Sequence, residues 1–545
     1  MTMQTKPSSA FAAVMEADVA IIGGGPVGTL LAILLGRQGR KVTLVERWSK
    51  AYGRPRAVTY DHEVARILAT LGIDSDHDAA INYHDELYYW KNAAGETLQI
   101  VDWQSISASG WRVRYWFNQP DLEVRLTRLA DQYPNITQLR GFEACELRQD
   151  AQNVDLTLCR TALEAPADKT RIALRAGYVV GADGANSFVR EALGLEMVDK
   201  GYFFDWLILD MVPHQPWTAT PAQWQLCDPR RPTTIVPGGP GRRRWEFMVL
   251  PQEVPSEVAQ EENAWLLLKP WGLTPENATL ERSAVYRFQA RWALAWQRGR
   301  CLIAGDAAHL MPPFAGEGLC AGLRDAFALG WRLNGLLDGW FGPEVLASYT
   351  SERAAHARHY IDFSQELGRI ICIADPKEAK ARDARMKEDL AARGEKPVPT
   401  DICRLGPGGW CERAAHAGEL SVQGVVRYQG ATGRFDQAVG EGWFVLGLEA
   451  DPANALTLKQ QARLAGLQGR ALTLTRQEEA GAVWDIEGTY RRWLGTLGVT
   501  YVILRPDFYV AATAYNAEEL CHYFEEVMQR VDAFQPQDLA LAQAG

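Results

Sequence analysis

A glycine-rich turn near the amino terminus constrains the fold of this 545-residue chain more than any other feature. The run Asp18–Ile22 is apolar and rich in β-branched residues, as in a strand buried on both faces of a parallel sheet. It leads directly into the segment Gly23–Gly28, which reads GGGPVG and fits the spacing G-x-G-x-x-G. A helical stretch, Thr29–Arg37, and a second strand, Lys41–Val45, follow. This order predicts the first strand–turn–helix–strand unit of a Rossmann-like α/β domain.

Each glycine of this turn has its own physical role. Gly23 permits the tight turn, Gly25 lets the backbone approach a pyrophosphate, and Gly28 lets the helix pack on the strand. The helix N-terminus then faces the anion with N–H groups that have no partner inside the helix. Glu46 follows the second strand and can accept hydrogen bonds from a ribose. The turn predicts a dinucleotide site, but alone it also fits an NAD-dependent dehydrogenase.

Two further segments combine a strand with an aspartate and a glycine-rich loop. Tyr178–Arg190 reads YVVGADGANSFVR, and Arg300–Asp306 reads RCLIAGD before a loop that ends at Gly318. An aspartate at a strand end can hold a sugar hydroxyl, and a glycine-rich loop before a helix receives negative charge. For either segment alone, a strand–turn–helix with a capping aspartate explains the residues equally well.

Together, the three motifs resemble those of the class A flavoprotein aromatic monooxygenases, the p-hydroxybenzoate hydroxylase group. Within that group, the chain is most similar to the 3-(3-hydroxyphenyl)propionate hydroxylases, from about residue 17 to about residue 520. The matching segments outside the three motifs are Arg54–Ala57, Cys227–Pro229, Arg244–Val249 and Leu504–Ala511. The cofactor motifs are highly specific for the family, whereas the substrate-facing segments are much less so.

The resemblance implies bound FAD, with NADH or NADPH docking transiently as the reductant. Gly23, Gly25 and Gly28 would hold the FAD pyrophosphate, and Glu46, with Arg47 beside it, the adenosine ribose. The other cofactor residues that it implies are Arg56 and Gln119 along the pyrophosphate and ribityl region, Asp183 for FAD binding and NAD(P)H docking, Asp306 at the ribityl chain, and Gly316 and Gly318 beside the isoalloxazine. For Arg56 and Gln119, a surface salt bridge and a helix cap are the alternatives.

The chemistry implied by the family is hydroxylation of a phenolic acid. O2 adds to the reduced flavin as a C4a-hydroperoxide, and the ring attacks it ortho or para to its hydroxyl group. The protein must keep water from the peroxide, which calls for an apolar, aromatic cavity. The middle of the chain offers candidates for that cavity, namely Tyr202, Phe203, Phe204, Trp206, Trp245, Phe247 and Phe288.

Three residues are the catalytic candidates. Pro313 would line the oxygen-reaction face, and His309 would belong to the flavin loop, with a general-base role as its alternative. Arg244 would bind an acidic substrate, with Arg114 and Arg287 as further candidates and a solvated charge as the alternative for each.

Three residues depart from the family pattern. Glu317 and Cys320 stand where the family often has Gln and Asn, and Ala328 replaces a frequent Asn. An ionised carboxylate beside the flavin would hinder flavin reduction, so we expect Glu317 to point away or to be protonated. The departures leave open a larger aromatic substrate (a polyketide, an indole or a quinolone) and a non-catalytic FAD-binding protein.

The predicted fold is α/β with three domains. Residues 17–200 and 285–375 form a discontinuous FAD-binding domain, interrupted by an antiparallel substrate-binding sheet at 200–285. A charged stretch, 375–396, ends at Pro397 and is typical of a linker or hinge. The resemblance implies a thioredoxin-like domain at 400–545, which lacks a C-x-x-C motif, so we expect a structural role or a homodimer contact.

Composition limits the classes of partner and the cellular compartment that we expect for this protein. The net charge is -10 without a concentrated basic run, which argues against a nucleic-acid partner. Nine cysteines without paired spacing predict free thiols in a reducing compartment, and residues 1–16 do not resemble a secretory signal. The uncharged run Val19–Gly36 contains the glycine turn, so we reject a membrane span and expect a cytoplasmic protein.

We expect no metal site. His356 and His359 have metal-compatible spacing on a predicted helix, Ser351–Ile371, but a third ligand is not evident. The charged segment SERAAHARHY is more typical of a solvated helix face.

Overall fold

The structure, a computed structural model, describes residues 14–50, 53, 56–161, 163, 170–201, 204–218 and 222–534. Contacts divide the chain into two units. Unit 1 comprises Met1–Gly53, Glu123–Val198 and Ala293–His309, and unit 2 comprises Arg54–Leu122, Asp199–Trp292 and Leu310–Gly545. Four residues named above, Arg54, Pro55, Tyr202 and Phe203, lie outside the described residues. The division into three domains stays a prediction.

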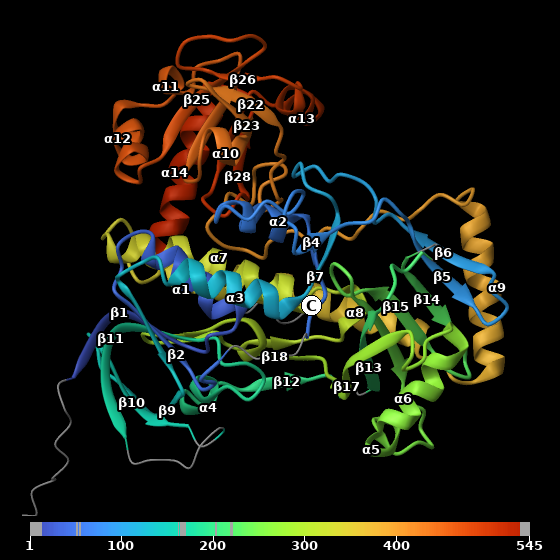
Figure 1. The fold of residues 1–545 in the computed structure, drawn as a ribbon. Coiled ribbons are helices and arrows are strands. Elements are labelled where there is room, and N and C mark those ends of the chain that lie inside the picture. Colours follow the sequence, from blue (N-terminus) through green and yellow to red (C-terminus); the bar gives the residue numbers. More distant parts are fainter. Residues whose placement is uncertain are drawn as a thin grey trace, which may run out of the picture. The chain divides into compact units, whose positions relative to one another are not determined.

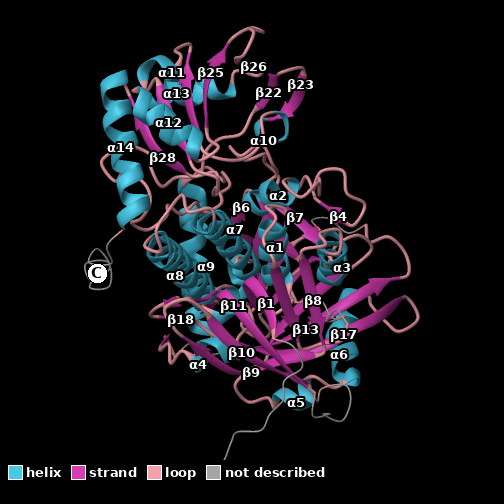
Figure 2. Cartoon of the chain, turned by 90° about the vertical axis from the view of Figure 1, so that its left-hand side faces the viewer, coloured by secondary structure: helices cyan, strands magenta, loops and turns pink. Residues whose placement is uncertain are grey.

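The predicted parallel sheet forms the core of unit 1. Its strand order is β19-β20-β11-β1-β2-β8, and the five strands from β20 to β8 run parallel. Figure 2 shows β11, β1 and β8 within this one sheet. The bounds are β1 Met15–Ile22, β2 Val42–Glu46, β8 Ile136–Arg140, β11 Arg171–Gly181, β19 Gln297–Arg298 and β20 Cys301–Ile303.

Helix α1 (Pro26–Gly36) follows the glycine turn, as predicted. Gly25 is its N-cap, with φ -72° and ψ -176°, and Pro26 occupies the first helical position, where its missing N–H costs nothing. Every residue of α1 except Val27 is buried, so this helix belongs to the core of the unit. The other helical segments of unit 1 are most of α3 (Gln119–Ala130), α4 (Phe188–Ala192) and the short 3₁₀ turn η2 (Gly305–Ala307).

A hairpin, β9 (Phe142–Gln149) and β10 (Val154–Arg160), extends the same sheet beyond β11. Its two strands bring Cys145 and Cys159 together in a disulfide. The prediction of free thiols was therefore wrong for this pair. The 14-residue separation carries no recognisable motif, because the antiparallel register of the hairpin creates the proximity.

The second unit contains the predicted antiparallel sheet, with strand order β17-β13-β16-β15-β14-β5-β6. Strands β5 and β6 come from an earlier part of the chain, and β5 pairs with β14 in parallel. The bounds are β5 Tyr88–Asn92, β6 Thr97–Val101, β13 Phe204–Pro213, β14 Trp224–Cys227, β15 Thr233–Pro237, β16 Arg243–Met248 and β17 Ala278–Phe288.

This sheet is buried on both faces. Leu207, Leu209, Trp245 and Phe247 pack in one cluster with residues of α5 (Pro255–Val258) and α6 (Glu261–Leu268). A second cluster joins the other face to the ends of the long helices, through Trp206, Phe288, Ile371 and Met386 among others. Large apolar residues at odd and even positions of the same strand allow this two-sided burial.

Three long helices follow in the second unit, namely α7 (Gly318–Leu337), α8 (Val345–Ile371) and α9 (Pro376–Ala392). Asp375 caps α9 by accepting hydrogen bonds from the N–H groups of Lys377 and Glu378. In Figure 1, α9 runs beside β5 and β6. The segment after α9 is not a free linker, because Val398 exchanges backbone hydrogen bonds with Ile100 and Asp102.

The carboxy-terminal part of unit 2 is a mixed α/β domain. Its sheet order is β23-β22-β26-β25-β24-β27-β28. Strand β24 is parallel to β25 and antiparallel to β27, which is antiparallel to β28, the arrangement expected of the predicted thioredoxin-like domain. Figure 1 shows this sheet flanked by α12 and α14. Its elements are β22 Val425–Tyr428, β23 Ala431–Arg434, α10 Phe435–Ala438, β24 Phe444–Leu448, α11 Pro452–Ala455, α12 Leu458–Gly466, β25 Arg470–Thr475, β26 Val483–Asp485, α13 Thr489–Leu497, β27 Tyr501–Leu504, β28 Val510–Ala514 and α14 Ala517–Ala533.

A small sheet of order β3-β7-β4 completes the secondary structure of unit 2 that concerns the site. The remaining elements are β3 Thr59–Asp61, α2 His62–Ala69, β4 Ile81–Asn82, β7 Arg114–Phe117, β12 Met197–Asp199, η1 Lys269–Trp271, β18 Arg291–Ala293, β21 His309–Leu310 and η3 Pro313–Ala315. Within the described ranges, none of the helices combines the length and the apolar character that crossing a bilayer requires.

Candidate active site

The glycine turn of unit 1 has the steric features that the sequence predicts. A Cβ on Gly23 would lie 2.2 Å from the carbonyl oxygen of Ala182, and its φ of +109° suits only glycine. A Cβ on Gly28 would lie 2.0 Å from the carbonyl oxygen of Gly23. In contrast, a Cβ on Gly25 would meet no atom of the described chain within 4 Å. Packing therefore explains Gly23 and Gly28, whereas the space beside Gly25 is open.

Two carboxylates of unit 1 lie where the sequence places them, at strand ends. Glu46 accepts hydrogen bonds from the N–H groups of Gly24 (2.7 Å) and Trp48 (2.9 Å), which fixes it beside the turn. Asp183 follows β11, and its Oδ2 accepts a hydrogen bond from Val189 N–H at 3.1 Å. Its Oδ1 is buried without a partner among the described residues, and burial raises the pKa of this carboxyl group. An unmatched buried acceptor of this kind fits a hydroxyl donor on a ligand.

The other predicted residues of unit 1 differ in their exposure. Arg47 and Asp306 are exposed, the latter in the turn η2. His309 is buried and packs against Trp296, with ring centroids 5.2 Å apart. A packed histidine fits a loop-positioning role better than a base, so the interpretation as part of the loop stays our prediction.

The remaining predicted cofactor residues belong to the second unit. Gln119 is buried and accepts hydrogen bonds from the backbone N–H groups of Arg56 (3.2 Å) and Ala57 (2.7 Å). It therefore fixes the 56–57 backbone, while the Arg56 side chain is exposed. Gly316 has φ +71° at the end of η3, and Gly318 begins α7. Pro313 begins η3 and is exposed.

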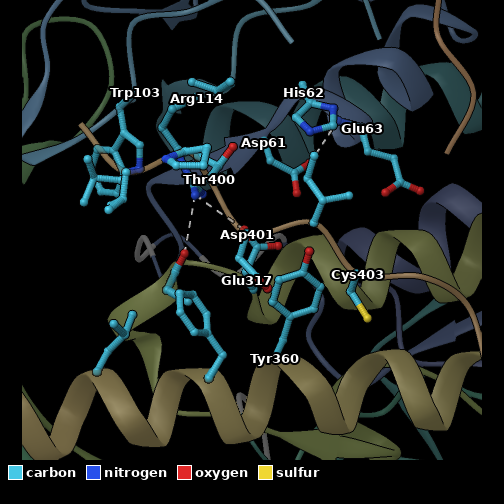
Figure 3. A pocket seen from close by; sticks show the side chains of 18 of the residues that line it. Asp61, His62, Glu63, Trp103, Arg114, Glu317, Tyr360, Thr400, Asp401 and Cys403 are labelled. Atoms are coloured by element: carbon cyan, nitrogen blue, oxygen red, sulfur yellow. Dashed lines mark hydrogen bonds and ion pairs between the residues drawn. The ribbon is translucent and has the colours of Figure 1, made fainter. Parts of the chain in front are cut away.

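A cavity of about 450 Å³ lies within the second unit. Its wall includes seven aromatic side chains, and it takes residues from several separate stretches of the chain. Figure 3 shows Asp61, Arg114, Glu317 and Tyr360 gathered around this space, with Tyr360 carried by α8. The aromatic residues of the wall are Tyr88, Trp90, Trp103, Phe314, Tyr360, Phe363 and Tyr509.

Of the aromatic residues proposed from the middle of the sequence, none that the structure describes lines this cavity. Trp245 and Phe247 belong to the cluster under α5 and α6. Trp206 and Phe288 pack against Phe314, which is itself a residue of the wall, at 5.5 and 5.6 Å between ring centroids. These two support the wall without forming it. Sequence spacing does not reveal this, because both faces of β13 and β16 are apolar.

Arg114, on the buried strand β7, is a cation of the cavity wall that has hydrogen-bond donors without a partner in the described part of the chain. Its side chain is 6 % exposed. Nη2 makes long contacts, 3.5 Å to the carbonyl oxygen of Ala315 and 3.4 Å to Oε1 of Glu317, whereas Nε and Nη1 have no hydrogen-bond partner in the described part of the chain. A buried guanidinium with two unused donors is costly unless a ligand oxygen accepts from them.

The other two cations proposed from the sequence are engaged elsewhere. Arg244 is buried and binds both carboxylate oxygens of Asp210, at 2.7 and 3.0 Å, and it does not line the cavity. Arg287 is 60 % exposed and pairs with Asp205. Among the three candidates, the structure therefore singles out Arg114.

A second guanidinium, that of Arg324 on α7, organises three carboxylates of the cavity wall. It binds Asp61, Glu63 (2.6 Å) and Glu317 (3.0 Å). Asp61 also caps α2 by accepting from the N–H groups of Glu63 and Val64. Asp61, Glu317 and Cys320 lie close enough to share an ion, but Arg324 already supplies the positive charge to both carboxylates.

The pKa values of the two carboxyl groups on either side of Arg324 are shifted in opposite directions. For Glu317, burial and the negative charge of Asp61 outweigh Arg324 and Arg114, and they raise the pKa to about 7. For Asp61, burial acts in the same sense, but Arg324 and the α2 N–H groups outweigh it and hold the pKa well below its usual range. The sequence-based expectation that Glu317 is protonated or points away is consistent with the first result.

The segment predicted as a linker and the carboxy-terminal domain complete the wall. Residues 398–403 line the cavity, and Asp401 binds His359 of α8. Tyr509 donates a hydrogen bond from its hydroxyl group to Glu63 Oε2 at 3.2 Å. Sequence reasoning missed both contributions. The available signal was the similarity over Leu504–Ala511, which belongs to a domain far from the other site residues along the chain.

The helix that carries His356 was also misjudged as having a solvated charged face. His356, Glu352 and Arg353 are buried, and Arg353 pairs with Asp325 at 3.0 Å. Glu352 binds Arg332 and Arg505 in the interior. Paired charges can be buried along a helix that its composition suggests is exposed.

Comparisons with known proteins agree with this geometry. Residues 16–364 match the family model described as "FAD binding domain", and residues 418–529 match the "HcaD C-terminal domain". A "Probable NADH-specific resorcinol 4-hydroxylase" of Rhodococcus jostii is 34 % identical over 94 % of this chain and 95 % of its own length. A "3-(3-hydroxy-phenyl)propionate/3-hydroxycinnamic acid hydroxylase 2" of Burkholderia vietnamiensis is 33 % identical over 91 % and 93 %.

Among solved structures, the chain is similar to the flavin-dependent monooxygenase PieE in complex with FAD and substrate. The TM-score is 0.78 at 21 % identity, and the match covers 95 % of this chain and 99 % of PieE. Aklavinone-11 hydroxylase with FAD and aklavinone gives a TM-score of 0.74 at 23 % identity, over 95 % and 99 %. At these identities, the likeness establishes the fold alone.

Proposed function

The chain belongs to the FAD-dependent aromatic monooxygenases, and we propose that it uses NADH to hydroxylate a small phenol of the resorcinol type. The Arg114 guanidinium carries this proposal, because it belongs to the wall of a cavity within the second unit and has two donor nitrogens without a partner in the described part of the chain. FAD supplies the oxygen-activating chemistry when bound. The protein binds and orients the ring, and it keeps water away from the reaction.

The residues of unit 1 fit the phosphate-bearing half of FAD. The open space beside Gly25 leaves room for a pyrophosphate at the N-terminus of α1, and no acidic residue lies in the first turn of this helix. Glu46 is fixed beside the turn, where a ribose would be held. The unmatched Oδ1 of Asp183 can accept a hydrogen bond from a sugar or ribityl hydroxyl.

Charge favours a substrate without a carboxylate. The wall of the cavity carries the carboxyl groups of Asp61, Glu63 and Glu317 against the guanidinium groups of Arg114 and Arg324, while Asp401 is paired with His359. A carboxylate tail would add a further negative charge to this excess. A hydroxyl group, in contrast, can accept from Arg114 while it remains neutral. The relative named for resorcinol hydroxylation supports the same substrate class.

A phenol with a carboxylate side chain is the second candidate. It is favoured by the relatives named for 3-(3-hydroxyphenyl)propionate and by the charge-assisted hydrogen bond that Arg114 offers to a carboxylate. In that case, the tail would accept from Nε or from Nη1, and the phenolic oxygen would have to lie elsewhere in the cavity.

Steady-state turnover of the purified holoenzyme distinguishes these substrates. We expect resorcinol to stimulate NADH oxidation about tenfold or more, with one oxygen atom of O2 in the ring and little peroxide. Stimulation by 3-(3-hydroxyphenyl)propionate alone would transfer the proposal to the second candidate. Peroxide without hydroxylated product, for either compound, would contradict both and point to a larger aromatic substrate.

Replacing Gly25 with alanine tests the proposed pyrophosphate position. Because a Cβ at this position meets nothing in the described chain, Gly25→Ala should leave the melting temperature of the apoprotein unchanged. FAD affinity should fall about tenfold or more, since the methyl group occupies the space proposed for the cofactor. Fluorescence titration of the apoprotein with FAD measures this affinity. Gly53→Ala, at another glycine with open space, is the control, and equal affinities for both variants would refute the assignment.

A homodimer is the partner that we propose beyond the substrate and O2. The carboxy-terminal domain lacks the paired cysteines of a redox module, so a structural role is the one left to it. Sedimentation velocity at several protein concentrations tests this, and a concentration-independent monomer would exclude it.

A further inference from the structure

We propose that Glu317 is the catalytic base that removes the proton of the substrate hydroxyl, leaving the resulting phenolate against the Arg114 guanidinium. This inference rests on the proposed hydroxylation of a phenol in the cavity of unit 2. It concerns the residue that turns the neutral ring into a stronger nucleophile.

The position of Glu317 carries the argument. Its side chain lies in the cavity wall, directly before α7, and is 5 % exposed. Oε1 lies 3.4 Å from Arg114 Nη2, and Oε2 lies 3.0 Å from Arg324 Nη1. The free donors of Arg114 belong to the same planar group as Nη2. An oxygen that accepts from Nη1 is therefore placed next to Glu317, as Figure 3 allows the reader to follow.

The charges of the wall favour a proton on Glu317. Asp61, Glu63 and Glu317 pair with two guanidinium groups, those of Arg114 and Arg324. Arg353, whose charge also acts on Glu63, is paired with Asp325. When Glu317 is ionised, this buried group carries one excess negative charge. Transfer of the phenol proton to Glu317 moves that charge onto the substrate oxygen, where Arg114 has unused donors. The net charge of the buried group does not change, so the transfer avoids the cost of burying a new charge.

The step is a simple proton transfer. The phenolic O–H bond breaks, an O–H bond forms on a carboxylate oxygen of Glu317, and no atom is oxidised or reduced. The electron pair stays on the substrate oxygen, from which it increases the electron density of the ring at the ortho and para positions. These are the positions at which the family resemblance places hydroxylation.

The proton affinities of the two groups are close enough for this transfer. Burial and Asp61 raise the pKa of Glu317 to about 7, against the opposing effect of Arg324 and Arg114. A free phenol has a pKa of about 10, and a guanidinium in contact lowers the pKa of an acid by about 1 to 3. Cys320 and Tyr360 also face Glu317, and both remain neutral because burial raises their pKa values well above the usual range.

The other ionisable groups of the wall are less suited to be the base. Arg324 holds the pKa of Asp61 well below its usual range, so this carboxylate is a weak base. Glu63 accepts from Arg324 and from the hydroxyl group of Tyr509. His62 shares a hydrogen bond with Ser109 at 3.0 Å, and burial lowers its pKa.

Spectroscopy of the bound phenol tests the inference without turnover. Resorcinol is added to the oxidised holoenzyme from about pH 5.5 to about pH 9, and the ultraviolet difference spectrum reports how much phenolate is bound. In the wild type, we expect phenolate to appear as the pH rises through about 7. In Glu317→Gln, resorcinol should still bind through Arg114, and because no neighbouring carboxylate then opposes the phenolate charge, the phenolate band should move to lower pH. At neutral pH, kcat/KM should fall about 100-fold or more.

A matched control is available in Glu246, another buried carboxyl group whose pKa burial raises to about 7. It lies beside Arg244 and Asp210 and does not line the cavity. Glu246→Gln should leave the phenolate titration unchanged. Glu317→Asp, which keeps the carboxyl group, should retain part of the turnover that Glu317→Gln loses, and the flavin absorbance reports whether each variant retains FAD.

The outcomes distinguish a failure of the base role of Glu317 from a failure of the proposed function. If resorcinol binds the wild type and Glu317→Gln with the same phenolate titration, Glu317 is not the base, although the proposed substrate stands. If bound resorcinol remains neutral in the wild type throughout the titration, the base role also fails. If neither resorcinol nor 3-(3-hydroxyphenyl)propionate binds the wild type, the proposed function fails, and this inference fails with it.

Discussion

Replacing Arg114 with methionine should lower kcat/KM for the phenol by about 30-fold to several thousand-fold while FAD remains bound. The Arg114 side chain is buried, and it is the guanidinium of the cavity with two unused donors. Truncating one partner of a buried, charge-assisted hydrogen bond costs about 2–5 kcal/mol, and each 1.36 kcal/mol corresponds to about tenfold in rate. Steady-state assays of NADH oxidation and of product formation measure the effect.

The Arg114 variant also removes one of the two cations that face Glu317. The loss should raise the pKa of Glu317 further and leave less of it ionised at neutral pH. Arg114→Lys keeps the charge but not the planar donor pair, so it should retain part of the activity. Arg287→Met, at an exposed arginine paired with Asp205, is the matched control and should lie within about twofold of the wild type. Full activity of Arg114→Met would exclude Arg114 from substrate binding.

Replacing Glu352 with alanine should destabilise the protein by about 3–5 kcal/mol, because it removes the carboxylate that two buried guanidinium groups share and leaves Asp507 as their remaining counter-ion. Glu352 is fully buried on α8. Its carboxylate accepts from Arg332 at 2.6 Å, from both terminal nitrogens of Arg505 at 2.7 Å, and from the N–H of Gly409 at 2.7 Å. This ion cluster joins the carboxy-terminal domain to the long helices of unit 2. Urea unfolding monitored by tryptophan fluorescence measures the loss.

The effect of Glu352 should depend on pH in a defined direction. Burial alone would raise its pKa, but Arg332 and Arg505 outweigh burial and hold the pKa below the usual 4.5. A carboxyl group with a lowered folded-state pKa stabilises the protein above its unfolded-state pKa and loses this contribution as the pH falls through the folded-state value. The difference in stability between wild type and Glu352→Gln should therefore shrink below about pH 4.5.

An exposed ion pair provides the comparison for Glu352. Arg427 and Glu478 pair at 3.3 Å with side chains 41 % and 58 % exposed. Glu478→Ala should cost less than about 1 kcal/mol. If Glu352→Ala unfolds at the same urea concentration as Glu478→Ala, the buried ion cluster does not hold the carboxy-terminal domain in place.

Local sequence determined the nucleotide-binding half of the molecule. The first strand, the glycine turn, α1 and the second strand follow one another without interruption between Asp18 and Glu46. Because the conformation of each step depends on its neighbours in the chain, the pattern of this unit is visible without tertiary structure.

The sequence also predicted the antiparallel sheet, most of helix α8 and, through family resemblance, the thioredoxin-like domain. It did not predict that the sheet is covered on both faces, or that Cys145 and Cys159 meet across a hairpin. Both outcomes depend on register and on which elements pack against a strand. A one-residue change of register reverses the face of every side chain, and composition does not encode it.

The cavity that we propose for the substrate was decided by tertiary structure alone. Asp61, Arg114, Glu317 and Tyr509 come from parts of the chain that are far apart, and only folding places them on one wall. In the sequence, Arg114 and Arg244 are equivalent candidates. In the structure, Asp210 binds Arg244, whereas two donor nitrogens of Arg114 have no partner in the described part of the chain. The nucleotide turn is a local structure that its own residues specify, whereas a buried charge acquires its chemistry from partners that the chain order does not reveal.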